Sequence, residues 1–262
     1  MDNDKINLRI MELREMMKAY SGEDDGVVSD QIAGLPQPPL EKVSMGTKFI
    51  PLTRNFDHII QNNNLLNIIN TRTSKRKYTQ ESLTLDELAF LLWATQGVKE
   101  IIGKQRKATL RTVPSAGARH PFETYLLINR VEGLEQGIYH YLASEHKLEY
   151  IKTIEAQTDR VSEAYCGQTF FGNAAVDFVW TVFPYRSEWR YDIDAHKYAL
   201  IDVGHVCQNL YLACEAIGCG TCAIGAYDQG LADGLLDLDS KPSYDNDNEF
   251  VLYAASVGKV DK

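Results

Sequence analysis

The sequence predicts an α+β domain organised around a mainly antiparallel sheet. Helix-like and strand-like segments alternate irregularly along the chain, and no internal repeat is found. Residues 137–141 and 147–151 are strand-like and are joined by a short polar turn, which is typical of an antiparallel hairpin. Residues 198–217 place apolar side chains at spacings of four and three, which predicts one long buried helix.

The composition excludes several classes of protein. The chain has 262 residues, 44% of them apolar and 24% charged, which suits one large globular domain with a substantial core. Its 27 basic and 36 acidic residues give a net charge of −9, which opposes nucleic-acid binding through phosphate contacts. No secretory signal or membrane-spanning apolar run is present, and the five cysteines suit a reducing compartment. We therefore expect a cytoplasmic protein.

The first 62 residues are predicted to form an extension that wraps the main domain, which covers residues 63–262. Ile6, Ile10, Leu13 and Met17 form the stripe of an amphipathic helix. Residues 21–26 form a flexible acidic break, and the prolines of residues 35–39 favour an extended chain.

The main domain is predicted to begin with a short helix through residues 65–69. Thr84 and Glu87 form a capping box that starts a second helix, which ends at Gly97. Further strands are expected at residues 122–128, 175–183 and 250–256. On the long helix, the apolar surface is widened by four additional side chains, so burial on most sides is expected. They are Leu200, Cys207, Tyr211 and Cys214.

Three segments carry residues suited to ligand binding. In an extended chain Arg72, Ser74 and Arg76 point the same way and suit a phosphate, although on their own they fit a solvated basic turn after a helix better. Residues 115–118 are small enough for a flat ligand to approach the backbone, or they simply form a tight turn. Arg119 and His120 at the edge of this segment either make polar contacts or are exposed. Residues 218–228 are again small and glycine-rich, which also suits close packing of a helix on a strand.

The joint order of these motifs resembles the nitroreductase superfamily of flavoenzymes. The motifs are Arg-x-Ser-x-Arg, the Thr-Leu-Asp-Glu-Leu helix ending in Leu-Trp-Ala-Thr-Gln-Gly, Pro-Ser-Ala-Gly-Ala-Arg, Gly-Ile-Tyr-His-Tyr, Gln-Asn-Leu and Gly-Ala-Tyr-Asp. The resemblance covers roughly residues 65 to 260. It is strongest to the branch that contains the SagB-type dehydrogenases, which are azoline oxidases of thiazole and oxazole peptide biosynthesis.

This resemblance implies an FMN-binding homodimer with a nitroreductase-like fold and two active sites at the subunit interface. The FMN phosphate, ribityl chain and pyrimidine edge would be held by Arg72, Thr73, Ser74 and Arg76. The partner subunit would cover the flavin ring with Pro114, Ser115, Ala116, Gly117 and Ala118. The ring and its N5 atom would face Ile224, Gly225 and Ala226, and Lys259 would supply another phosphate-binding cation.

The resemblance also identifies Lys197 and Tyr198 as candidate catalytic residues, because the azoline oxidases carry such a pair for proton removal. An exposed lysine beside a core tyrosine is the other interpretation. The stretch Tyr185, Arg186, Trp189 and Arg190 either lines the substrate pocket or is a surface loop. The rival zinc or iron–sulfur site, built on Cys207, Cys214, Cys219 and Cys222, is disfavoured because only the last two have ligand-like spacing. We expect no metal.

The expected function is that of an FMN-dependent oxidoreductase. Hydride would pass from NAD(P)H through flavin N5 to a small nitro- or quinone-like acceptor in a ping-pong cycle. The alternative is an azoline oxidase, in which a peptide thiazoline or oxazoline reduces the flavin and oxygen reoxidises it. A non-catalytic flavin- or metal-binding module is a third hypothesis. The expected partners are a second copy of the chain and a small-molecule or peptide substrate, with no nucleic acid and no membrane.

Overall fold

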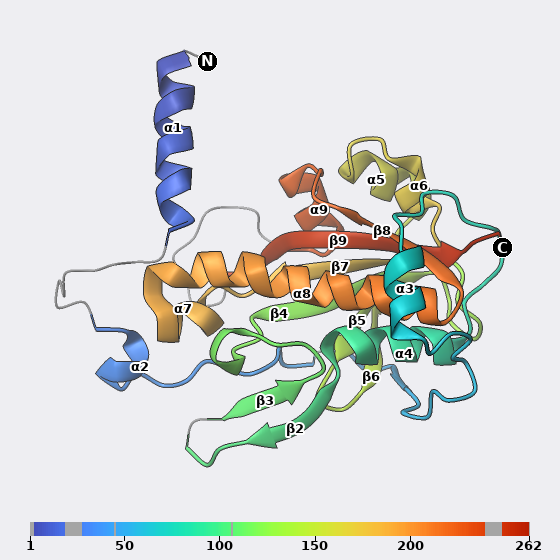
Figure 1. Cartoon of the computed structure of the whole chain (residues 1–262), viewed down its shortest axis with the longest axis horizontal. Helices are drawn as coiled ribbons and strands as arrows, with labels where there is room; N and C mark the ends of the chain where they lie inside the picture. The colour runs from blue at the N-terminus through green and yellow to red at the C-terminus, as the bar shows by residue number, and fades with distance from the viewer. Residues whose placement is uncertain (1–2, 19–27, 45, 106, 239–247, 262) are drawn as a thin grey trace.

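The computed structural model describes residues 3–18, 28–44, 46–105, 107–238 and 248–261. Its centre is a seven-stranded sheet in which all neighbouring strands are antiparallel (Figure 1). In spatial order the strands are β1 (Phe49–Pro51), β6 (Lys147–Lys152), β5 (Gly137–Leu142), β4 (Phe122–Ile128), β7 (Val176–Val182), β9 (Phe250–Lys259) and β8 (Cys219–Ile224). A separate hairpin pairs β2 (Val98–Ile102) with β3 (Ala108–Arg111). The predicted α+β class and antiparallel sheet are confirmed.

Helices cover both faces of this sheet. On one face α4 (Leu85–Gln96) and α8 (Ala195–Ala216) pack into the larger apolar core, and on the other α5 (Gln157–Ala164) and α9 (Gln229–Leu235) pack into a second core. The remaining helices are α1 (Asn3–Met16), α2 (Asp30–Ala33), α3 (Leu65–Thr71), α6 (Thr169–Gly172) and α7 (Tyr185–Tyr191). None of the helices in the described ranges is both long and apolar enough to cross a membrane.

Local sequence signals place several of these elements. The capping box at the start of α4 is confirmed, because the Thr84 hydroxyl accepts from the Glu87 amide and the Glu87 carboxylate accepts from the Thr84 amide. Strand β4 matches the predicted 122–128 residue for residue. Strands β5, β6 and β7 have β-branched or aromatic residues at or near their centres, which favours a strand. Each of them begins and ends within one residue of its predicted bounds.

Helix α8 differs from its prediction in two respects. It begins at Ala195, three residues earlier than predicted, and ends at Ala216. Burial on most sides is wrong for this single chain, because Leu200 and Ile201 are each about half exposed. Helix α3 lies beside α8 (Figure 1), and its Leu65, Leu66 and Ile69 are likewise exposed. Both helices therefore expose large apolar side chains that nothing in the described part of the chain covers.

The N-terminal segment contacts the body of the domain over part of its length. Strand β1 adds an edge strand beside β6, and the carbonyl of Leu35 accepts a hydrogen bond from the Trp189 indole. Helix α1 is confirmed as a helix, and none of its residues is buried. The predicted break at residues 21–26 lies outside the described residues, and the domain boundary at residue 62 stays a prediction.

Candidate functional site

The cationic segment that follows α3 runs along the free edge of the sheet. Arg72 caps α3, and the chain then forms a parallel bridge in which Ser74 pairs with Thr221 of β8. The Lys75 amide donates to the Thr221 carbonyl over 2.9 Å. Because β8 is the last strand of the sheet, this pairing fixes the segment against the strand that leads into Gly225 and Ala226.

Tyr211 of α8 links the cationic segment to β8. Its hydroxyl lies 3.0 Å from the Ser74 hydroxyl and accepts from the Ala223 amide over 2.9 Å, and its ring lies 5.2 Å from the Arg72 guanidinium. From the sequence, Tyr211 is predicted only to widen the apolar surface of the helix. The available signal was its hydroxyl, since a half-buried tyrosine usually finds a polar partner.

Arg76 and Lys259 each contact another part of the chain. The Arg76 guanidinium is 6.0 Å from the ring of Phe170, on α6. Lys259 ends β9 and forms an ion pair with Glu87, the capping-box residue of α4. Burial acts to lower the pKa of Lys259, but the Glu87 carboxylate outweighs it and raises the pKa. The positive charge of Lys259 is therefore already compensated within the chain.

Gly225 and Ala226 follow β8 in an exposed position, whereas Ile224, the last residue of the strand, is buried in the second core. A Cβ on Gly225 would lie 3.8 Å from the ring of Tyr253 on β9, which is ordinary contact. The Ala226 carbonyl accepts from the side-chain Nε2 of Gln168 over 3.3 Å. These small residues leave the backbone after β8 accessible to a ligand.

Residues Pro114 to Ala118 form a tight turn against the N-terminal half of α8. The Ala116 amide donates to the Asp202 carboxylate over 3.0 Å, and the Ser115 hydroxyl accepts from the His120 amide over 2.9 Å. Gly117 has φ +55°, and a Cβ there would lie 2.4 Å from the Tyr191 hydroxyl. Only glycine satisfies both the left-handed backbone and this close approach.

Lys197 and Tyr198 lie at the start of α8, close to the Pro114–Ala118 turn. The Lys197 ammonium donates to Asp194 over 3.2 Å and to the Lys18 carbonyl over 2.8 Å. The Tyr198 ring packs edge-on against Tyr191, with centroids 5.0 Å apart. Tyr191 therefore contacts both the candidate catalytic pair and the glycine of the turn.

Within one chain the two groups of predicted site residues do not meet. The Pro114–Ala118 turn contacts α8 at Asp202, and the Arg72–Ser74 segment contacts it at Tyr211. Nine residues of α-helix correspond to ~13.5 Å along the axis and about two and a half turns. The two contacts are therefore far apart and on opposite sides of α8.

Four residues considered as ligand or pocket contacts are buried within the chain. Arg119 donates to the carbonyl of Arg186 over 3.0 Å and lies over the ring of Trp189, and all three side chains are almost fully buried. The stretch containing the last two is helix α7, so the surface-loop interpretation is wrong, and these two side chains do not line an open pocket. His120, at the edge of the turn, is also buried.

The cysteines do not form a metal cluster. Across the described ranges, no group of three or more His, Cys, Asp or Glu residues is arranged to hold a metal ion. Burial raises the pKa of Cys207 and of Cys219 to about 12, so these groups are thiols at neutral pH rather than the thiolates that bind metals.

The chain matches one family model and resembles several known proteins in sequence or in fold. The model of the Nitroreductase family matches residues 69–259. A proposed nitroreductase of Methanocaldococcus jannaschii is 33% identical over 163 residues, which are 62% of this chain and 79% of that protein. The trifolitoxin-processing protein of Rhizobium leguminosarum is 29% identical over 136 residues, which are 49% of this chain but only 36% of that protein. The crystal structure of a proposed nitroreductase of Ralstonia eutropha superposes with a TM-score of 0.64 at 21% identity, covering 87% of this chain and 95% of the other.

Proposed function

Because the chain belongs to the nitroreductase family, and is thus an oxidoreductase, we propose that it binds FMN and reduces a small organic acceptor with electrons from NADH or NADPH. The observation that carries this proposal is the contact of Arg72 and Ser74 with Tyr211 at the edge of β8. It gathers a guanidinium and two hydroxyl groups at the Ala223 amide of β8, two residues before the exposed Gly225. The guanidinium and hydroxyl groups suit an anionic group of a ligand, and the exposed glycine backbone suits the close approach of a flat ring.

Each group of residues has a distinct role in this proposal. Arg72, Thr73, Ser74 and Arg76 would hold the phosphate, ribityl chain and pyrimidine edge of FMN, because guanidinium groups donate forked hydrogen bonds to phosphate. Ile224, Gly225 and Ala226 would present backbone to the ring. Bound FMN supplies the uptake and release of hydride, which no side chain of the protein can perform. Lys259 contributes less in this proposal, because Glu87 already pairs with it.

A second copy of the chain completes the proposed site. The Pro114–Ala118 turn lies on the opposite side of α8 from the Arg72 segment, so it would cover the FMN bound by the other copy. The exposed apolar side chains of α3 and α8 suit such an interface. Leu66→Glu on α3 is expected to give a monomer without FMN. Leu231→Glu, at another exposed leucine on α9, is the control and should leave the dimer intact.

Azoline oxidation is the second candidate function. Two observations favour it: the similarity to a trifolitoxin-processing protein, and the location of Lys197 and Tyr198 beside the Pro114–Ala118 turn. In this reaction the pair would take a proton from the substrate as hydride leaves, which requires Lys197 to release the Asp194 carboxylate. Lys197→Met is then expected to abolish oxidation of an azoline peptide while FMN stays bound.

One experiment separates these functions. The absorbance spectrum of the purified protein should show flavin bands, and anaerobic NADH or NADPH should bleach them before an added nitroarene restores them. Bleaching by a thiazoline peptide but not by nicotinamides would replace the first proposal with the second. Flavin bands that neither donor bleaches would indicate a binding protein without turnover.

A further inference from the structure

Asp202 is a buried carboxylate on α8 that binds the backbone of the Pro114–Ala118 turn. It is only 5% exposed, and its two oxygens accept from the Ala116 amide at 3.3 and 3.0 Å. Burial raises the pKa of the Asp202 carboxyl, and the Ser115 hydroxyl and the Ala116 amide oppose this rise. Because a buried carboxylate is costly without hydrogen-bond donors, the carboxylate and the amide stabilise each other.

The turn that Asp202 binds has a strained backbone. The φ angles of Gly117, Ala118 and His120 are all positive, at +55°, +52° and +44°. Glycine adopts this left-handed region readily, but alanine and histidine do so at a cost in free energy, so their surroundings must impose it. Strained backbone of this kind is concentrated at active sites and ligand-binding sites.

Asp202 fixes the position of this turn relative to α8. Hydrogen bonds within the turn join the Ala118 amide to the Ser115 carbonyl and the Arg119 amide to the Ala116 carbonyl, so they set its local shape only. The bond from the Ala116 amide to Asp202 joins the turn to a helix 86 residues further along the chain. Without this acceptor, the strained turn would be free to relax.

Asp202 and the proposed FMN clamp lie on different sides of α8. Within one chain, the Arg72 segment contacts this helix at Tyr211, and the turn contacts it at Asp202. In the proposed dimer, the turn covers the FMN that the other copy holds. Asp202 would then act on a site to which its own copy does not contribute Arg72.

We propose that Asp202 is a positioning residue, whose carboxylate keeps the Pro114–Ala118 turn in the shape that covers the FMN ring bound by the second copy. The inference rests on the proposed function, because it assigns a further residue to that same site. Asp202 acts through the Ala116 amide and not on FMN directly, so its loss is expected to change the surroundings of the ring. Binding of the phosphate, which depends on the Arg72 segment, should largely persist.

Variants of Asp202 test whether its carboxylate holds the turn. Asp202→Leu has a similar size but no acceptor, whereas Asp202→Asn keeps an oxygen that accepts from Ala116. Hydrogen–deuterium exchange of residues 115–118 should be about 10-fold faster in Asp202→Leu, the factor expected from losing one hydrogen bond to a charged group, and near normal in Asp202→Asn. At saturating FMN, the visible circular dichroism of the flavin should change in the first variant and not in the second.

Ala116→Pro removes the donor instead of the acceptor, and it covers the case in which Asp202→Leu does not fold. Proline suits the first position of a helical turn, and Ser115 before it is already extended. This variant should show the same change in flavin circular dichroism as Asp202→Leu, and combining the two substitutions should add nothing.

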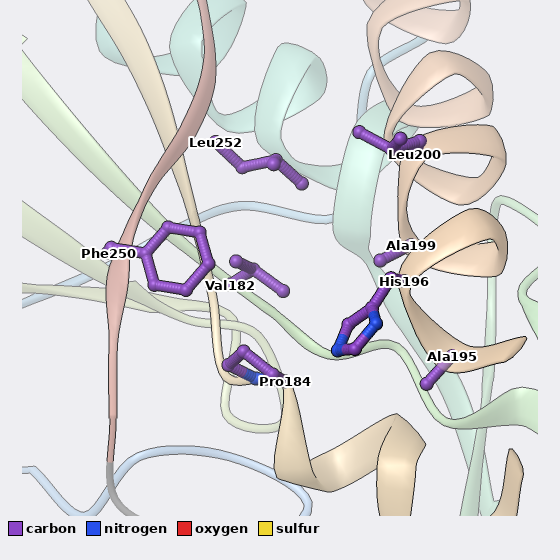
Figure 2. A pocket seen from close by; sticks show the side chains of 8 residues that line it. All are labelled: Val182, Pro184, Ala195, His196, Ala199, Leu200, Phe250 and Leu252. Atoms are coloured by element: carbon purple, nitrogen blue, oxygen red, sulfur yellow. The ribbon is translucent and has the colours of Figure 1, made fainter. Parts of the chain in front are cut away.

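Ala199→Val is the matched control on the same helix. Ala199 lines an apolar pocket of about 130 Å³ between α8 and the ends of β7 and β9, and Figure 2 shows it facing the same space as Val182 and Phe250. The added methyl groups enter this space rather than the turn. Exchange of residues 115–118 and the flavin signal should therefore stay unchanged.

Mixed dimers test whether Asp202 acts on the site of the other copy. A chain with Asp202→Leu is paired with a chain carrying Arg72→Ala and Arg76→Ala, so that the only intact clamp is covered by the only intact turn. The bound FMN should then give the unmodified signal. When all three substitutions are in one chain and the other is unmodified, the only clamp is covered by the Asp202→Leu turn, and the signal should be altered.

The outcomes separate this inference from the function on which it rests. Unchanged flavin signals in Asp202→Leu and Ala116→Pro, or the reverse pattern in the mixed dimers, would overturn the inference. So would folded Asp202→Leu protein that binds no FMN, because Asp202 would then be needed for binding rather than for positioning. Unmodified protein that binds no FMN would refute the proposed function, and the role of Asp202 with it, even where the exchange rates show that Asp202 holds the turn.

Discussion

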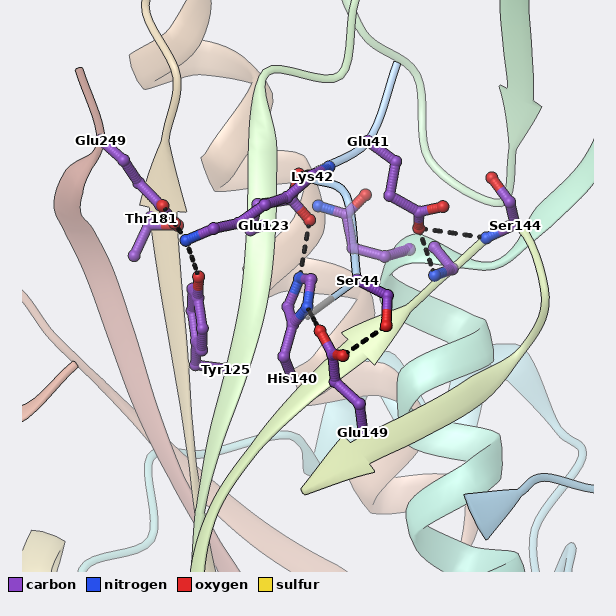
Figure 3. A network of polar contacts seen from close by, with 12 residues as sticks. Glu41, Lys42, Ser44, Glu123, Tyr125, His140, Ser144, Glu149, Thr181 and Glu249 are labelled. Carbon is purple, nitrogen blue, oxygen red and sulfur yellow. Dashed lines mark hydrogen bonds and ion pairs between the residues drawn. The ribbon is translucent and has the colours of Figure 1, made fainter. Parts of the chain in front are cut away.

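Lys42 holds the N-terminal segment to the sheet through a buried polar network, and its replacement by methionine is a sharp test of how the segment stabilises the domain. Figure 3 shows Lys42 beside Glu249 and Tyr125. Its ammonium lies 2.6 Å from the Glu249 carboxylate and 2.8 Å from the Tyr125 hydroxyl, and its amide donates to Glu123.

The network is balanced in charge only with Lys42 present. His140 lies between Glu123 and Glu149, at 2.9 and 2.7 Å, and Arg186 pairs with Glu123. Burial alone would lower the pKa of His140, but its two glutamate partners outweigh burial and raise the pKa to about 9. The cations are thus Lys42, His140 and Arg186, which balance the carboxylates of Glu123, Glu149 and Glu249.

Lys42→Met keeps the length of the side chain and leaves Glu249, only 4% exposed, without its cation. Breaking a fully buried pair costs about 3–5 kcal/mol. Because the Lys42 side chain is one-third exposed, we expect the lower value of about 2–3 kcal/mol in the free energy of unfolding. Adding Glu249→Gln removes the uncompensated charge and should recover more than half of the loss.

The assay is urea unfolding followed by tryptophan fluorescence, with the midpoint and slope compared among variants. Lys48→Met is the matched control, because Lys48 pairs with Glu135 at 3.4 Å with both side chains exposed, and such pairs contribute at most about 1 kcal/mol. A loss in Lys42→Met no larger than that in Lys48→Met would refute this account. So would a double variant as unstable as the single one.

Three further predictions follow from the site and the network. Arg72→Ala with Arg76→Ala should yield colourless protein that retains its fold, measured by absorbance and circular dichroism; full FMN occupancy would contradict the assigned clamp. The stability that protonated His140 contributes should be complete below pH 6.5 and lost as the pH rises toward 9, so the melting temperature should fall over that range, but not in His140→Gln. Gly117→Ala should cost about 1–3 kcal/mol of stability, because its φ is positive and a Cβ would clash with Tyr191; an unchanged urea midpoint would show that the turn relaxes freely.

Sequence patterns located the elements that depend on local signals. The Thr84–Glu87 capping box and the apolar run of β4 needed no knowledge of distant contacts. Strand β8 was missed because its Gly, Cys and Ala residues have weak strand preference, and it is held by pairing with β9 on one side and the Ser74 segment on the other. Helix α7 was missed because it is only seven residues long and is stabilised by burial of Arg186 and Trp189.

In the candidate site, too, local sequence signals predicted some features, whereas others depend on contacts between distant segments. Residue types predicted the Arg72 segment and the Pro114–Ala118 turn, but only the structure shows that α8 separates them. In a dimer with two-fold symmetry, each copy contributes both groups, one to each site. In the proposed dimer, the exposed apolar side chains of α3 and α8 would form the surface that brings the groups together. Such a dimer would explain why one helix carries both sets of site contacts and also exposes large apolar side chains, which a helix buried wholly within one chain would not do.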